Sequence, residues 1–104
     1  MRSTIQRVEV AKNIARKCED VAAVLRSLAH PVRLKILSRL VDRERTVNDL
    51  TMYCGTSQSA MSQFLKRMKA EGLVAARREG QRIYYRIHEA DLHRLMRALS
   101  DIYC

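Results

Sequence analysis

The side chains best suited to chemistry lie on one face of a helical stretch in the middle of the chain. They are amides, hydroxyls and ammonium groups, with no acid among them: Gln58, Ser59, Ser62, Gln63, Lys66 and Lys69. Amides and hydroxyls hydrogen-bond to base edges in the major groove of DNA, and ammonium groups bind phosphates. On an isolated helix, the simpler interpretation of such a face is an ordinary solvated surface. The neighbouring segments decide between a solvated surface and a DNA-binding face.

The element that must position this face runs from about residue 57 to residue 71. Thr56 and Ser57 can cap its first free N–H groups, and as part of a DNA-binding helix they are also expected to contact phosphates. Gly72 suits the left-handed conformation that follows a last helical turn. The opposite side is apolar at helical spacing and consists of Met61, Phe64, Leu65 and Met68. The sequence therefore predicts an amphipathic helix that buries one side and leaves the polar face free.

Two shorter helices are expected before it. The first spans Pro31–Val41, with Leu34, Ile36, Leu37, Leu40 and Val41 facing a core and Arg33, Lys35 and Arg39 facing outward. A charged loop, Asp42–Arg45, leads to a second helix over Val47–Tyr53 that Thr46 caps. A turn at Cys54-Gly55 then joins this helix to the polar one. Two helices joined by such a turn form a helix-turn-helix, whose second helix enters the major groove.

After Gly72 the apolar period changes from helical to alternating. The segment from about residue 73 to residue 87 is predicted to form a β-hairpin, with strands Leu73–Arg77 and Arg82–Ile87 and a turn at Glu79-Gly80-Gln81. Its arginines, Arg77, Arg78 and Arg82, are expected to contact phosphates or the minor groove as a wing. The alternative is a small sheet whose arginines keep one edge solvated.

Apolar helices are expected at both ends of the chain. The seam of the first, over about residues 5–29, consists of Val8, Ala11, Ala15, Cys18, Ala22 and Leu25, with a candidate break near Cys18. The stripe of the last, over about residues 89–103, consists of Leu92, Leu95, Met96, Leu99, Ile102 and Tyr103. The middle helices already close much of the core, so these two are expected to pair with a second subunit. A twofold homodimer would place two recognition helices about one DNA turn apart, on a palindromic operator.

Composition narrows the function classes. The 104 residues suggest one domain, over residues 1–104, and the net charge of +9 suggests a polyanionic partner, double-stranded DNA first and an acidic membrane surface second. No apolar run is long enough for a membrane span and no signal peptide is visible, so a cytoplasmic protein with no membrane partner is expected. No catalytic grouping is apparent, and no enzyme activity or cofactor is predicted. Three cysteines favour thiols over a disulfide framework.

Several motifs together resemble the ArsR–SmtB family of transcriptional repressors. They are Leu28–Leu37 at the entry to the first middle helix, Ser57–Leu65 in the recognition helix, Glu71–Val74, and Arg77–Tyr85 in the hairpin. The resemblance covers the chain from about Val21 to its end. It implies a mainly α winged helix-turn-helix with a small β-hairpin, forming homodimers that repress transcription and leave DNA when an inducer binds.

The resemblance also suggests where a metal inducer would bind. The family's C-x-C site would fall at Val47 to Asp49, where this chain has no thiol. A second family site, on the last helix, would use Asp91, His93 and Cys104, although its fourth ligand is missing. Across an antiparallel pair of helices, Asp91 and His93 of one subunit could meet Cys104 of the other. The simpler alternative is that Asp91 is a first-turn acid and His93 a surface residue. The primary expectation is therefore that the protein binds no metal.

Thiol chemistry is the other candidate. The end of the chain, Leu99–Cys104, resembles the sulfide- and redox-responsive branch of the family (BigR- and HlyU-like), which links this terminal cysteine to one in the second helix. Here that partner position holds Ser38. Either Ser38 is native and sensing is lost, or it is an engineered Cys→Ser change, or Cys104 pairs with Cys18 instead. Cys18 and Cys54 also have a simpler interpretation as packed apolar residues.

The leading function is therefore a dimeric, sequence-specific DNA-binding regulator, expected to be a repressor that an oxidant or reactive sulfur releases. One alternative is a metal-responsive repressor that uses the last helix. The other is an inducer-independent, nucleoid-type DNA binder that displaces competing proteins.

Overall fold

The structure is a computed structural model, and it describes residues 15–104. The predicted seam positions Val8 and Ala11 lie outside that range. The chain divides into two compact units, residues 1–30 and residues 31–104, which are described separately.

The described part of the first unit contains helix α2, Cys18–Leu28. A turn at Lys17 precedes it, so a break exists beside the predicted position near Cys18, but Asp20, the expected cap, lies inside the first turn. Glu19 and Asp20 occupy the first turn, where negative charge complements the helix dipole.

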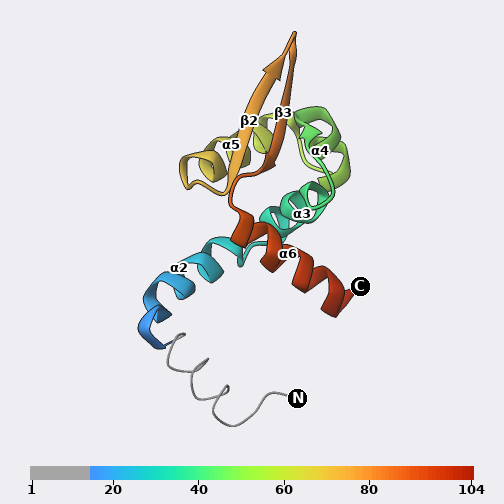
Figure 1. Ribbon diagram of the computed structural model, residues 1–104. Helices are drawn as coiled ribbons and strands as arrows, with labels where there is room; N and C mark the ends of the chain where they lie inside the picture. The colour runs from blue at the N-terminus through green and yellow to red at the C-terminus, as the bar shows by residue number, and fades with distance from the viewer. Residues whose placement is uncertain (1–14) are drawn as a thin grey trace. The chain divides into compact units, whose positions relative to one another are not determined.

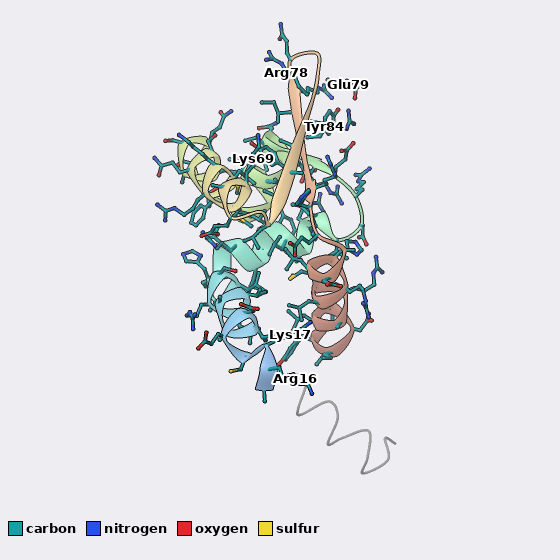
Figure 2. The ribbon with its side chains drawn as sticks, turned by 60° about the vertical axis from the view of Figure 1, so that its left-hand side comes forward. Arg16, Lys17, Lys69, Arg78, Glu79 and Tyr84 are labelled. Carbon is teal, nitrogen blue, oxygen red and sulfur yellow. The ribbon has the colours of Figure 1, made fainter. Side chains whose placement is uncertain are left out.

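The second unit holds four helices and three strands (Figure 1). In chain order they are α3 (Pro31–Leu40), β1 (Arg45–Thr46), α4 (Val47–Cys54), α5 (Gln58–Ala70), β2 (Val74–Glu79), β3 (Arg82–Ile87) and α6 (Ala90–Tyr103). The hairpin of β2 and β3 projects beyond the helices, as Figures 1 and 2 both show.

Local capping sets the ends of the helix-turn-helix. Thr46 caps α4 by accepting the N–H of Asp49 at 3.1 Å, and Ser57 caps α5 by accepting the N–H of Ala60 at 3.1 Å. Gly55 ends α4 in the left-handed conformation, with φ +67°. A side chain at this φ would be strained, so glycine is the residue that permits a tight turn between the two helices.

The core of this unit lies where α4 meets α3 and α5. The predicted stripe of α5 is confirmed, because Met61, Leu65 and Met68 are fully buried and Phe64 is half-buried. The other fully buried side chains are Ile36, Leu37, Leu50 and Val74. Burial of one side of α5 fixes its polar face toward solvent.

One helix face departs from the prediction. Arg33 of α3, expected to face outward, is only 8% exposed, whereas Leu34, expected in the core, is 36% exposed. Arg33 donates to Glu71 at 2.6 Å and thereby ties α3 to the end of α5. A buried cation needs such a partner, and the partner lies far away in the sequence, where helical periodicity cannot reveal it.

The sheet contains a strand that the sequence did not reveal. β1, in the segment expected to be a loop, pairs with β3, so the strand order is β1-β3-β2 with both pairings antiparallel. The hairpin register places Arg77 opposite Tyr84 and Glu79 opposite Arg82. Its two-residue loop, Gly80-Gln81, is one residue shorter than predicted.

This arrangement is a winged helix-turn-helix, and the predicted fold class is confirmed. No helix within residues 15–104 is both long and apolar enough to span a membrane.

Candidate nucleic-acid interface

The polar face of α5 is exposed to solvent. All six predicted side chains on it are exposed: Gln58, Ser59, Ser62, Gln63, Lys66 and Lys69. An α-helix turns by about 100° per residue, which places Ser59, Gln63 and Ala70 almost opposite the buried stripe. Gln63 also borders a hollow with Ala60, Phe64 and Arg67. The polar side chains among the most outward positions of α5 are thus an amide and a hydroxyl.

A cleft of about 350 Å³ lies between α4, α5 and the turn of the hairpin. We call it the polar cleft, and it is lined by Thr46, Val47, Asn48, Gln58, Ser62, Gln81, Arg82 and Ile83. It brings together three predicted DNA-contact residues from two elements, Gln58 and Ser62 of α5 and Arg82 of β3. It also adds Asn48 and Gln81, which the sequence patterns did not single out. No carboxylate lines it, so its chemistry suits a nucleic acid.

The predicted wing arginines occupy different environments. Arg78 and Arg82 are exposed, and Arg78 lies at the far end of the hairpin in Figure 2, where its Nε donates to the Gly80 carbonyl at 3.0 Å. Their guanidinium groups therefore remain accessible to phosphates.

Arg77, the third predicted wing contact, is already engaged. Its Nε donates to both carboxylate oxygens of Glu44, at 2.8 and 2.9 Å, and its Nη2 also donates to Oε1 of Glu44. Its Nη1 donates to Glu79 at 2.8 Å, and its guanidinium stacks 4.5 Å from the ring centre of Tyr84. Hydrogen bonds from Arg77 hold the pKa of Glu44 below its ordinary value of 4.5. Arg77 therefore has two carboxylates in place of a phosphate.

Thr56 also differs from its prediction. Ser57, not Thr56, caps α5, and the Thr56 hydroxyl oxygen is buried with no hydrogen-bond partner in the described part of the chain. A buried oxygen counts against a phosphate contact by Thr56.

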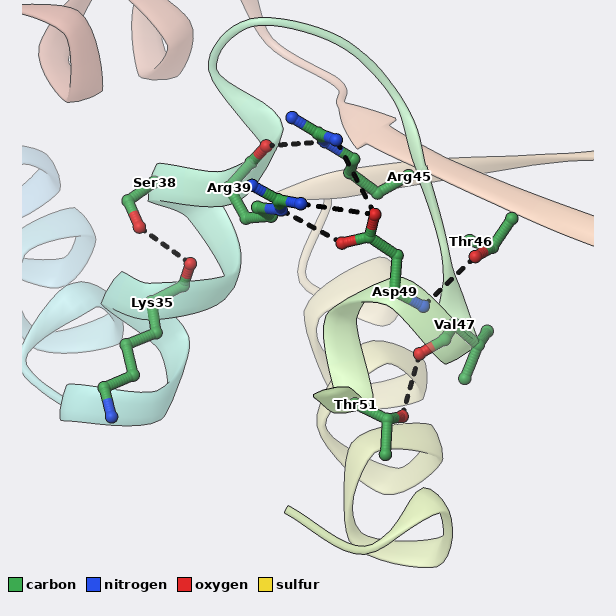
Figure 3. A network of polar contacts seen from close by, with 8 residues as sticks. All are labelled: Lys35, Ser38, Arg39, Arg45, Thr46, Val47, Asp49 and Thr51. Atoms are coloured by element: carbon green, nitrogen blue, oxygen red, sulfur yellow. Dashed lines mark hydrogen bonds and ion pairs between the residues drawn. The ribbon is translucent and has the colours of Figure 1, made fainter. Parts of the chain in front are cut away.

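A polar network positions α4 under the interface (Figure 3). Arg39 of α3 donates to both oxygens of Asp49, at 3.0 and 3.4 Å, and Arg45 approaches the same carboxylate at 3.6 Å. The hydrogen bond from Arg39 lowers the pKa of Asp49. The network joins α3, β1 and α4, and thereby holds one wall of the polar cleft.

A second cleft, of about 340 Å³, lies between α3 and α6. It is lined by Leu34, Lys35, Ser38, Val41, Met96, Leu99, Ser100, Tyr103 and Cys104. Ser38 and Cys104, the two positions at which the resemblance places a sensing pair, thus border one cleft.

The cysteines fall into two groups. Cys18 and Cys104 are exposed in the single chain. Cys54 is buried, and burial raises the pKa of its thiol, as expected for a packed and unreactive cysteine.

The side chains of the alternative metal site are dispersed within one chain. His93 Nε2 lies 2.5 Å from the Val41 carbonyl, and Asp91 pairs with Arg94 at 3.6 Å. Within residues 15–104, no three His, Cys, Asp or Glu side chains gather as a metal site requires. A site shared between two subunits stays a prediction.

Comparison with known sequences identifies the family. Residues 30–76 match the model described as "Bacterial regulatory protein, arsR family". The biofilm growth-associated repressor of Xylella fastidiosa is 36% identical over 89% of this chain and 82% of its own length. The chain belongs to the ArsR family. A second member, the transcriptional activator HlyU of Vibrio cholerae, is 33% identical over 92% of this chain and 85% of its own length.

Solved structures of similar proteins agree with the fold. The transcriptional repressor BigR from Xylella fastidiosa superposes with a TM-score of 0.82, at 35% identity, over 90% of this chain and 96% of that one. A homodimeric winged helix-turn-helix domain from Mycobacterium bovis superposes with a TM-score of 0.71, at 39% identity, over 85% and 82%.

Membership confirms the main functional expectation. The chain is a DNA-binding transcriptional regulator of the ArsR family, and its relatives are regulators of transcription, not enzymes. Those relatives include both a repressor and an activator.

Proposed function

We propose that this regulator is a homodimeric, sequence-specific repressor that a thiol-reactive signal releases from a palindromic operator in double-stranded DNA. The polar cleft is the observation that supports DNA recognition most strongly. Amide, hydroxyl and guanidinium groups from α4, α5 and the wing line it, and no acid does. A bacterial regulator of transcription acts where the chromosome lies, so we place the protein in the cytoplasm.

The proposed contacts divide by chemistry. Base edges are read by Gln58, Ser59, Ser62 and Gln63, whose amides and hydroxyls can donate and accept. The DNA backbone is bound by Ser57, Lys66, Lys69, Arg78 and Arg82. Asn48 joins the first group because its amide lines the polar cleft beside Gln58 and Ser62.

Dimerisation is proposed through the first and last helices. In α2, Val21, Val24 and Leu25 are 39%, 41% and 53% exposed, and near the end of α6 Ile102 and Tyr103 are 71% and 80% exposed. Apolar side chains repeated along a helix gain most by burial against a partner. Two DNA-reading faces related by a twofold axis would then read two half-sites.

The proposed switch is oxidation of two thiols, Cys104 and Cys18. An organic persulfide would take two electrons and two protons from the pair, forming one disulfide and leaving the persulfide as a thiol and hydrogen sulfide. Both thiols are exposed in the single chain. Ser38, across the cleft from Cys104, has a hydroxyl and cannot supply the second sulfur.

The test is fluorescence anisotropy of a labelled operator duplex titrated with reduced protein and then with persulfide-treated protein. We expect persulfide to abolish specific binding, and Cys104→Ser to remain bound after the same treatment. Loss of binding in persulfide-treated Cys104→Ser would contradict a role for this thiol.

Two further arms separate the alternatives. Release by zinc alone, reversed by a chelator, would favour the intersubunit site of Asp91, His93 and Cys104. Binding that neither reagent changes would mean a DNA-binding competitor with no working switch. In that case Ser38→Cys should restore release, because positions 38 and 104 border one cleft.

A further inference from the structure

One short segment of the second unit contacts both strands of the wing. This segment, residues 44–46, is called the strut and consists of Glu44, Arg45 and Thr46. Glu44 binds the guanidinium of Arg77 on the wing, at 2.8 and 2.9 Å from its Nε. Thr46 pairs with Tyr84 of β3. Arg45 pairs with Tyr85 of the same strand. Glu44 therefore holds β2, and the other two strut residues hold β3.

The same segment also holds the helix-turn-helix. Thr46 caps α4 through the N–H of Asp49 at 3.1 Å. Arg45 approaches the Asp49 carboxylate at 3.6 Å and donates to the Arg39 carbonyl at 3.3 Å. A displacement of the strut would therefore change the position of the wing relative to α4, and with it the polar cleft.

Arg77 is the wing residue that binds the side chain of Glu44 in the strut. Its guanidinium is bound on one side by Glu44 and on the other by Glu79, and it stacks on Tyr84 across the hairpin. Multiple charge-assisted hydrogen bonds fix the direction of a guanidinium better than a single contact does. A group held in this way can direct a strand, but it has few donors left for a phosphate.

We propose that Glu44 is a positioning residue for DNA binding, which holds the wing at its working angle by gripping Arg77, and that Arg77 itself is not a phosphate ligand. This inference rests on the proposed function, since it assumes that the wing contacts DNA.

For Glu44→Gln, simple electrostatics and a positioning role predict opposite changes in operator affinity. An acid near a DNA-binding face repels phosphates, so its removal from a chain of net charge +9 should tighten binding. If Glu44 sets the wing angle, its removal should loosen operator binding although the protein becomes more positive. The sign of the change in affinity for Glu44→Gln therefore decides between the two.

The experiment measures operator affinity by anisotropy for Glu44→Gln, with Glu79→Gln as the matched control. Both variants gain one positive charge and lose one carboxylate partner of Arg77, but only Glu44 bridges two elements. We expect Glu44→Gln to bind about three- to tenfold more weakly, the scale of a charge-assisted contact at a partly exposed site. Glu79→Gln should bind at least as tightly as the wild type.

A double variant and a footprint show whether the effect passes through the wing. Glu44→Gln combined with Arg77→Gln should bind no more weakly than Glu44→Gln alone, because both substitutions break one contact. Hydroxyl-radical footprints should lose protection at the outer, wing-contacted flanks and keep it over the half-site centres. Exchanging the two charges, by Glu44→Arg with Arg77→Glu, should restore the flanks.

Tighter operator binding by Glu44→Gln would overturn the proposal. If Glu44→Gln fails to fold by circular dichroism, Arg77→Lys replaces it as the test. Lysine keeps the positive charge but lacks the forked donors of arginine. If Arg77 positions the wing, Arg77→Lys should bind the operator more weakly than the wild type. If Arg77 contacts a phosphate, Arg77→Lys should keep almost all of the wild-type affinity. Failure of the proposed function itself would look different, because the wild type would then show no preference for any sequence.

Discussion

Gln63 is the residue on which the account of base reading depends most. It is exposed and lies almost opposite the buried stripe of α5. Gln63→Ala should relax the preference at one base pair per half-site, at a cost of about 1–3 kcal/mol against the preferred base, because a lost bidentate contact leaves a base edge unpaired. Binding to a panel of single-base operator variants measures this.

The control for Gln63→Ala is His88→Ala, which removes an exposed side chain that does not line the polar cleft. It should leave the base preference over the half-site centre unchanged. An unaltered sequence profile for Gln63→Ala would refute the assignment of Gln63 as a base reader.

Arg82 should contribute to DNA affinity through its charge and not to the choice of DNA sequence. It is exposed and lines the polar cleft. Arg82→Ala should weaken binding to all duplexes alike and reduce the slope of log affinity against log salt by about 1, because one phosphate contact releases about one counterion. Arg97→Ala, which removes a charge from α6, serves as the control. An equal change in slope for both variants would mean that only the net charge matters.

At the residue scale, sequence patterns identified side chains by type but not by their partners. The polar face of α5 followed from helical spacing alone, and its exposure is confirmed. Arg33 and Arg77 were assigned to solvent and to DNA because arginine usually serves there. Their partners, Glu71 and Glu44, lie 38 and 33 residues away in the chain, beyond the reach of any local pattern.

At the scale of elements, helices were predictable because their ends are encoded locally. Pro31, Ser57 and Gly72 lie at or beside the ends of α3 and α5, within one or two residues of the predicted bounds. β1 was not predictable, because two residues show no alternation and its partner strand lies about forty residues later.

The contact between α3 and α4 makes a pH prediction. Arg39 holds the pKa of Asp49 below its ordinary value of 3.8 in the folded chain. Below that value the unfolded chain binds more protons than the folded one, so the free energy of unfolding should fall as the pH falls. The stabilisation is present in full above the ordinary pKa and is lost as the pH falls through the lowered one.

Urea denaturation at several acidic pH values measures this dependence. Asp49→Asn should flatten the fall in stability below pH 3.8, since it removes the titrating group. Arg39→Gln should flatten the fall in stability over the same pH range, because the Asp49 carboxylate then lacks the hydrogen bond that lowers its pKa. An Asp49→Asn profile parallel to that of the wild type would show that this contact does not stabilise the fold.

At the scale of the whole molecule, the ArsR family and the winged fold fix the general activity, and the termini are proposed to fix the assembly. Exposed apolar residues on α2 and at the end of α6 favour a second subunit. A dimer would carry a net charge of +18, twice that of one chain, and would present two polar faces to one side of a duplex.

Selection of bound sequences from a random pool of duplex DNA, with the reduced protein, tests the central claim most directly. We expect an inverted repeat whose half-site centres lie about 10–10.5 base pairs apart, because two recognition helices related by a twofold axis must enter successive major grooves. We further expect Gln63→Ala to lose the preference at one position of each half. A single unrepeated site, or a pool with no enriched sequence, would contradict a dimeric, sequence-specific regulator.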